Sequence, residues 1–151
     1  MRPNIIFYNK PDPNRYGREK QPDIGRLIQA VISDNLGKQA CTIVELGCGK
    51  GALQHIHPNY IGLDISFFAL ETYLHKPAIQ ADMEFLPFKN NVVDMVFSIA
   101  AIEHIPHPER CLAEIDRILC PGGIAILAPA WFCRPAQPKI CVISGIVNWD
   151  G

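Results

Sequence analysis

The most informative segment of this chain is Val44-Glu45-Leu46-Gly47-Cys48-Gly49-Lys50-Gly51. Residues 41–46, CTIVEL, form a short run of β-branched and apolar residues, which predicts a strand, and the glycines directly behind it predict a tight turn. Glycines at alternate positions allow backbone conformations that a side chain would forbid, and they let the backbone approach a ligand closely. Taken alone, the stretch could also be a plain glycine turn between a strand and the next element.

Strand and helix patterns alternate on both sides of this stretch. Before it, apolar residues at helical spacing predict a helix over residues 23–36. After it, helices are expected behind Ser66 and from Pro108 to the Pro121-Gly122-Gly123 break. Further strands are expected at residues 60–63, 78–81, 92–99 and 124–128. This order predicts an α/β fold, Rossmann-like and doubly wound, with a mostly parallel sheet and helices on both faces.

The chain divides into an arm, one domain and a tail. Residues 1–22 carry four prolines and predict an irregular arm, while residues 23–130 contain all of the alternating elements. Residues 131–151 form a tail of uncertain structure, in which residues 140–147 could be one last strand or an apolar end. A length of 151 residues with 48% apolar content suits a single hydrophobic core.

Composition excludes several classes of function. Fourteen basic against fifteen acidic residues give a net charge of −1 without long charged blocks, so neither nucleic acid nor a membrane is an expected partner. The apolar runs are far shorter than the ~20 residues of a membrane span, and no signal peptide is recognisable, which predicts a cytoplasmic protein. The six cysteines lack C-x-x-C or Cys/His ligand spacing, so free thiols and no metal are expected.

Acidic residues stand at the ends of the first three predicted strands. Glu45 precedes the glycines, Asp64 closes the second strand and Asp82 closes the third. Parallel sheets bind ligands at the carboxyl ends of their strands, and a carboxylate there suits the two hydroxyls of a ribose. Because Gly47, Gly49 and Ala52 also satisfy the loose dinucleotide pattern, a nicotinamide cofactor remains open on spacing alone.

Five motifs in order resemble the class I S-adenosylmethionine-dependent methyltransferases, in particular the small-molecule methyltransferases. They are VELGCGKG at 44–51, IGLDIS at 61–66, ADMEFLPF at 81–88, DMVFSIAAIEHI at 94–105 and LAEIDRILCPGG at 112–123. The resemblance implies S-adenosyl-L-methionine as the cofactor and transfer of its methyl group to O, N, C or S of a small-molecule acceptor. An NAD-dependent oxidoreductase is disfavoured, since no Tyr-x-x-x-Lys or comparable hydride-transfer site is present.

The resemblance also implies a cofactor site, residue by residue. Glu45, Gly47, Cys48 and Gly49 would surround the methionine part. Asp64 would bind the ribose and Ile65 would pack on the adenine. Asp82 would accept from the adenine amino group, Met83 would lie beside the ring, and Ser98 with Ile99 would close the floor of the pocket. Asp64 and Asp82 could instead be ordinary turn or capping acids.

No catalytic residue can be assigned from the pattern. His104 could act as a general base, or it could fix its loop or face the substrate; Tyr16 of the arm is a second candidate base. The sulfonium is already a strong methyl donor, so the main task of the protein is to orient the acceptor.

The chain departs from the family pattern in two places. Only a stunted helix fits between Gly51 and Tyr60. After the fifth strand about twenty residues remain, so the sheet is expected to lack its usual last strands. This shortness suggests a fragment or truncated protein, self-association through the exposed edge of the fifth strand, or a catalytically inactive cofactor-binding module.

Overall fold

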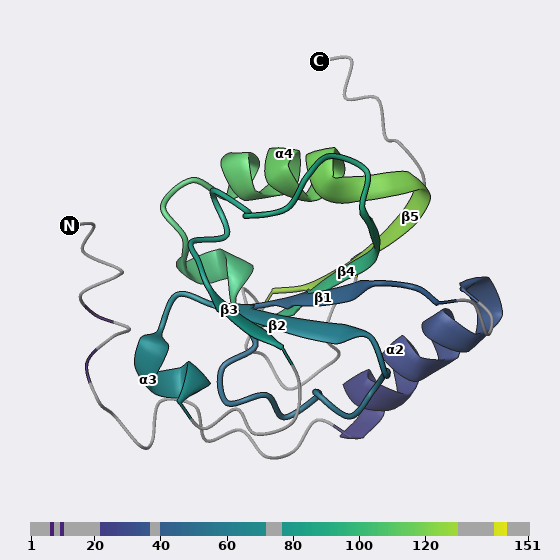
Figure 1. The fold of residues 1–151 in the computed structure, drawn as a ribbon, viewed down its shortest axis with the longest axis horizontal. Helices are drawn as coiled ribbons and strands as arrows, with labels where there is room; N and C mark the ends of the chain where they lie inside the picture. The colour runs from purple at the N-terminus through teal and green to yellow at the C-terminus, as the bar shows by residue number, and fades with distance from the viewer. Residues whose placement is uncertain are drawn as a thin grey trace.

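A six-stranded sheet with helices on both faces forms the core of the chain (Figure 1). The computed structural model describes residues 7, 10, 22–36, 40–71, 77–129 and 141–144. The helices are α2 (Pro22–Asn35), α3 (Phe67–Leu70), the 3-10 helix η1 (Ile102–His104) and α4 (Pro108–Ile118). The strands are β1 (Ile43–Leu46), β2 (Tyr60–Asp64), β3 (Ala78–Gln80), β4 (Val93–Ile99), β5 (Leu119–Ala128) and β6 (Cys141–Ser144).

The strand order β3-β2-β1-β4-β5-β6 confirms the predicted Rossmann-like, doubly wound class. The first five strands in the chain are parallel, and β6 runs antiparallel to β5. β1 lies between β2 and β4, so the direction of winding reverses at β1. The loop behind Leu46 therefore stands at the topological switch point, where sheets of this class bind ligands.

Both faces of the sheet are covered, as the continuous apolar character of the strands predicts. On one face, Val44 and Leu46 of β1 pack in a cluster with Ile115 and Ile118 of α4. On the opposite face, Ile43 packs in a second cluster that includes three isoleucines of α2. Figure 1 shows α4 above the sheet and α2 with α3 below it. The fully buried β1 thus carries the glycine loop on a support packed from both sides.

β5 begins earlier than the sequence predicts. Leu119 directly follows α4 and pairs with Val93, and after a register shift Ile124 pairs with Met95. Between these pairs the strand bulges, and Gly122 takes a left-handed conformation with φ +81°. The Pro-Gly-Gly segment is therefore a bulge inside the strand and not a loop before it.

The segment between β1 and β2 contains no helix, so the expected stunted helix is wrong. All of residues 47–59 are described, and they form successive turns closed by bonds three residues apart, from Gly51 N to Cys48 O and from Gln54 N to Gly51 O. These bonds span three residues, whereas the bonds of an α-helix span four, so the connection forms tight turns in place of an α-helix.

The tail supplies one strand. β6 pairs with β5 over residues 124–127, so the edge of β5 that we expected to be exposed is covered there. The rest of the tail, and the arm apart from Phe7, Lys10 and the start of α2, lie outside the described residues, as does Tyr16. Within the part of the chain that the structure describes, no helix is long and apolar enough to cross a membrane.

Candidate functional site

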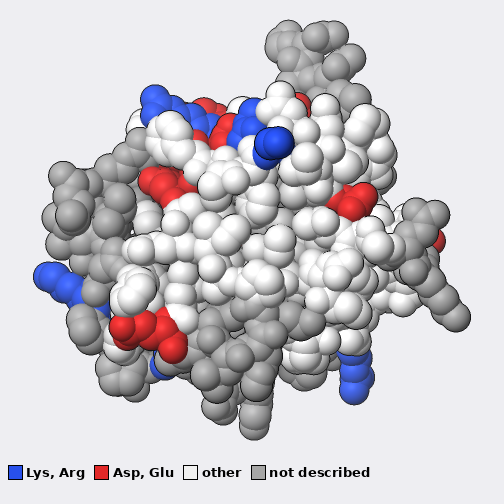
Figure 2. Space-filling model, in the orientation of Figure 1, with Lys and Arg blue, Asp and Glu red and all other residues white. Residues whose placement is uncertain are grey.

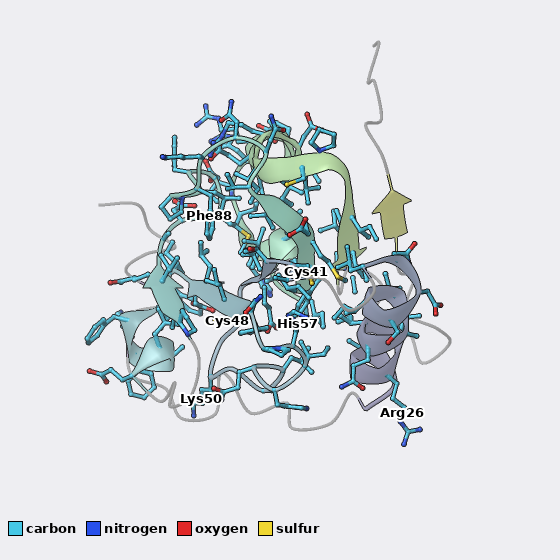
Figure 3. The ribbon with its side chains drawn as sticks, turned by 45° about the vertical axis from the view of Figure 1, so that its right-hand side comes forward. Arg26, Cys41, Cys48, Lys50, His57 and Phe88 are labelled. Atoms are coloured by element: carbon cyan, nitrogen blue, oxygen red, sulfur yellow. The ribbon has the colours of Figure 1, made fainter. Side chains whose placement is uncertain are left out.

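The glycine loop behind β1 has a backbone that only glycine tolerates well. Gly47, Gly49 and Gly51 have φ values of +74°, +53° and +76°. A Cβ on Gly47 would lie only 2.3 Å from the Cβ of Ala101, because the loop passes directly against the end of β4. The backbone N–H groups of Gly47 and Cys48 both donate to the Leu63 carbonyl, at 2.7 and 3.1 Å. Figure 3 shows Cys48 and Lys50 on this loop.

Asp64 joins the loops that follow β1 and β2. Its Oδ2 accepts from the Gly49 N–H and its Oδ1 from the Ser66 N–H, both at 2.8 Å. Ser66, and not Asp64, caps α3, because the Ser66 Oγ accepts from the Ala69 N–H. Each carboxylate oxygen has a second lone pair, so Asp64 can accept two ligand hydroxyls while it holds both loops. Burial raises the pKa of the Asp64 carboxyl, and its bonds from backbone N–H groups oppose that shift.

Glu45 lies beside Asp64 in a buried environment. Its side chain is on the α2 face of β1, where its Oε2 accepts a short hydrogen bond from the Tyr60 hydroxyl. Burial raises the pKa of Glu45 to about 8; the bond from Tyr60 opposes this shift, and the charge of Asp64 adds to it. Glu45 is therefore mostly neutral at pH 7, and only Asp64 of this pair carries charge readily.

The loop behind β3 brings Asp82 and Met83 to the same edge of the sheet. The Ala81 N–H donates to the Asp64 carbonyl at 3.1 Å, which fixes the start of this loop beside β2. Met83 is buried, and its Cε lies 3.5 Å from the position that a Cβ on Gly47 would occupy. Asp82 is half-buried and its Oδ1 accepts from the Glu84 N–H at 3.0 Å. Ile65, which follows Asp64, is also half-buried.

The end of β4 supports the glycine loop. The buried Ser98 hydroxyl donates to the Leu46 carbonyl at 3.0 Å, so this hydroxyl ties β4 to β1. Ile99 is half-buried and packs against the α2-side cluster. Ala100 has the left-handed φ of +50°, which is unfavourable for alanine, and its N–H donates to the Ala128 carbonyl. This strained backbone conformation changes the direction of the chain, and the next residue, Ala101, packs against the glycine loop.

His104 follows on η1, at the same edge as the glycine loop. Its side chain is 55% exposed, and its Nε2 lies 4.0 Å from Oε1 of the largely buried Glu103. The His104 backbone N–H donates to the Ala101 carbonyl, which sets η1 directly behind the residue that packs on Gly47. His104 thus has the exposure that a group reacting with an incoming acceptor needs.

The structure brings together all ten residues of the predicted site at the carboxyl edge of β1, β2, β3 and β4. Sequence reasoning missed Tyr60 and Ala101. A tyrosine at the start of a buried strand requires a partner for its hydroxyl, and this requirement was the available signal for Tyr60. Nothing in the sequence indicated that Ala101 would contact Gly47. Among the described residues, no group of three His, Cys, Asp or Glu side chains is placed to hold a metal ion.

The donor set fits S-adenosylmethionine. Acids at the ends of β1, β2 and β3 can accept from an amino group, a ribose diol and an adenine amino group. The apolar Met83 is buried beside Gly47 at the same edge of the sheet. The absence of a side chain at Gly47 lets the backbone of the loop pack directly against Ala101. These features define the class of the site as a nucleoside-cofactor site of a doubly wound sheet.

Comparison with known proteins identifies the family. A family profile described as "Methyltransferase domain" matches residues 44–127, more than half of the chain. The chain belongs to this family. Class I methyltransferases use S-adenosylmethionine, and S-adenosylmethionine is the cofactor of this chain. Assignment to the family also decides against the oxidoreductase alternative.

Individual relatives support the assignment. The uncharacterized protein MJ1252 of Methanocaldococcus jannaschii is 35% identical over 127 residues, which are 82% of this chain and 47% of that protein. The human mitochondrial arginine-hydroxylase NDUFAF5 is 32% identical over 126 residues, 78% of this chain and 36% of that protein. The chain thus spans about half or less of the length of these relatives.

Solved structures agree in fold. The crystal structure of a putative S-adenosyl-L-methionine-dependent methyltransferase from Methanococcus maripaludis matches with a TM-score of 0.62 and 24% identity, over 71% of this chain and 56% of that one.

Replacement of Gly47 by alanine tests the close contact with Ala101. Gly47→Ala should lower the free energy of unfolding by more than the ~1–2 kcal/mol of left-handed strain, because its Cβ also collides with Ala101. The double variant Gly47→Ala/Ala101→Gly should regain the part of the lost free energy of unfolding that is due to the collision. Urea unfolding of the two variants and of Ala101→Gly measures the coupling; purely additive effects would contradict the contact.

The buried Glu45 predicts a pH-dependent stability. Its pKa is raised from 4.5 to about 8, so its contribution to stability is complete below pH 4.5 and is lost as the pH rises toward 8. Glu45→Gln should abolish this loss and be more stable than the wild type by more than about 1 kcal/mol at pH 8. Urea unfolding from pH 5 to 8 measures the free energy of unfolding of both proteins. The control is Glu109→Gln, which changes an exposed glutamate. Parallel pH profiles of wild type and Glu45→Gln would show that Glu45 is not the titrating group.

Proposed function

We propose that this chain transfers the methyl group of S-adenosylmethionine to a nucleophilic atom of a small-molecule acceptor. The observation that carries the proposal is the buried carboxylate of Asp64, which accepts from the Gly49 and Ser66 N–H groups and has one further lone pair on each oxygen. Such a carboxylate, beside left-handed glycines at the switch point of the sheet, suits the ribose of the cofactor.

The cofactor would lie across the carboxyl edge of the sheet. In this proposal Glu45 and the backbone of Gly47, Cys48 and Gly49 surround its methionine part. A neutral Glu45 can offer both a carbonyl oxygen and a proton, while its Tyr60 bond fixes the position of the carboxyl group. Asp64 holds the ribose and Asp82 the adenine amino group. Ile65 and Met83 pack on the adenine, and Ser98 and Ile99 support the pocket from beneath.

Methyl transfer needs little acid-base chemistry from the protein. The bound sulfonium supplies an electrophilic methyl group, and the residues of the chain orient the acceptor in line with it. Where the acceptor must lose a proton, we assign that proton to His104, which is exposed behind the glycine loop. The small-molecule acceptor and the absence of nucleic-acid or membrane partners are also parts of this proposal, whereas self-association through the edge of β5 is not, because β6 covers that edge.

The relatives widen the choice of acceptor and of chemistry. A methyltransferase of Mycobacterium leprae named for phthiotriol and phenolphthiotriol dimycocerosates is 34% identical over 93 residues, and the human relative is named an arginine-hydroxylase. A cofactor-binding chain without methyl transfer is the second candidate, since the human relative carries a name other than methyltransferase. Detection of S-adenosylhomocysteine as a product separates methyl transfer from binding alone.

Calorimetric titration tests the cofactor site. The wild-type chain should bind S-adenosylmethionine and S-adenosylhomocysteine but not NAD. Asp64→Asn should weaken both affinities at least about tenfold, because one charged acceptor of the ribose is lost. Asp116→Asn, an exposed acid on α4, serves as the matched control and should bind like the wild type. Equal binding by Asp64→Asn would overturn the role of Asp64, and binding of NAD alone would overturn the function.

A panel of small nucleophiles, with S-adenosylhomocysteine release as the assay, tests His104. His104→Ala should lower kcat by roughly 10²-fold or more for acceptors that must lose a proton, and should leave the cofactor affinity unchanged. Phe67→Ala, which removes an exposed side chain of α3, is the control. Unchanged turnover of His104→Ala would remove the residue from the mechanism.

A further inference from the structure

The loop that carries Asp82 and Met83 has no helix or strand of its own. Residues 81–92 are all described and form turns between β3 and β4. Apart from the bond of Ala81 to the end of β2, the cofactor-side residues of this loop need support from another element. Figure 3 shows Phe88 of the loop near α4. The fixed element beside the loop is therefore α4.

Arg117 of α4 holds the second half of this loop. Its guanidinium donates to the Leu86 carbonyl at 3.0 Å, to the Phe88 carbonyl at 2.8 Å and to the Asn90 Oδ1 at 2.9 Å. Two further bonds, of 2.7 and 2.8 Å, go to the two carboxylate oxygens of Glu114. One planar fork thus binds three loop residues and is itself held by a bidentate carboxylate.

Glu114 completes the support. Its Oε2 accepts from the Leu86 N–H at 2.7 Å, so both backbone groups of Leu86 are bound to the Glu114–Arg117 pair. The Glu114 and Arg117 side chains are only 22% and 30% exposed. The hydrogen bond from Arg117 lowers the pKa of Glu114, so the pair is charged across the neutral range.

A second ion pair joins the loop to α4 nearer the site. Arg110 lies 3.7 Å from the carboxylate of Glu84, whose side chain is fully buried and which directly follows Met83. Arg110, Glu114 and Arg117 stand at i, i+4 and i+7, so they form one stripe of α4. Cys111, Ile115 and Ile118 form the neighbouring buried stripe. Figure 2 shows acidic and basic side chains together at the α4 end of a face whose centre is uncharged.

We propose that Glu114 and Arg117 are positioning residues for cofactor recognition: they hold the loop so that Asp82 meets the adenine amino group, and thereby select an adenosyl over an inosyl ligand. The proposal rests on the cofactor site proposed above and deepens it. Inosine has a carbonyl oxygen in place of the amino group, so a fixed Asp82 carboxylate faces another acceptor and rejects it. When the loop is released from α4, Asp82 can move away from the base, and the preference for the adenosyl over the inosyl ligand falls.

The test compares the dissociation constants of S-adenosylhomocysteine and S-inosylhomocysteine by calorimetry. The wild type should prefer the adenosyl ligand by about tenfold or more, since the inosyl ligand loses a hydrogen bond to a charged group. Arg117→Ala should bring this ratio close to one, whereas Arg117→Lys, which keeps the charge but not the fork, should give an intermediate ratio. Arg26→Ala, at an exposed arginine on α2, should keep the wild-type ratio.

Glu114→Gln serves as the second variant where Arg117→Ala does not fold, because it keeps the shape of the side chain and removes only its charge. It should also lower the ratio. A merely structural role would weaken both ligands equally and leave the ratio unchanged, and that result would overturn the proposal. A wild-type chain that binds neither ligand would instead overturn the cofactor site itself, so the two failures are distinguishable.

Discussion

The carboxylate of Asp64 is the interaction on which the site depends. It lies at the end of β2 and holds the N–H of Gly49 in the loop after β1 and that of Ser66 at the start of α3. Two loops that are separate in the sequence therefore share one buried anchor. Of the three left-handed glycines, Gly47 and Gly51 donate to backbone carbonyls, while Gly49 donates to Asp64. Each oxygen of the same carboxylate has a further lone pair, which the proposed function assigns to the ribose hydroxyls.

The surroundings of Asp64 concentrate charge on this one group. Glu45, its neighbour on β1, is buried and bonded to Tyr60, and its raised pKa keeps it mostly neutral at pH 7. Two buried carboxylates side by side would otherwise repel each other. Opposite them, Ala101 packs on Gly47 and Met83 reaches the same place from the loop after β3. The site is thus built from the ends of four strands, with its outer loop held from α4 by Glu114 and Arg117.

The fold was largely predictable because hydrophobic periodicity and glycine turns are local signals. The helix over residues 22–35, the five parallel strands and the switch point at Gly47 follow from them. The bulge at Gly122 was not predictable, since it depends on how β5 pairs with β4. The motifs named the residues of the site, but not the Tyr60 bond to Glu45 or the contact of Ala101 with Gly47. Both join residues that lie far apart in the sequence and meet only after the strands are assembled.

Hydrogen exchange of the individual Gly49 and Ser66 amides, followed by NMR with and without S-adenosylhomocysteine, tests whether Asp64 anchors both loops and the cofactor. If Asp64 holds both loops and the ribose together, both amides are protected in the free chain and become more protected in the complex. Loss of protection at either amide on binding would mean that the ligand displaces these bonds. Asp64 would then not be the shared anchor of the loops and the cofactor.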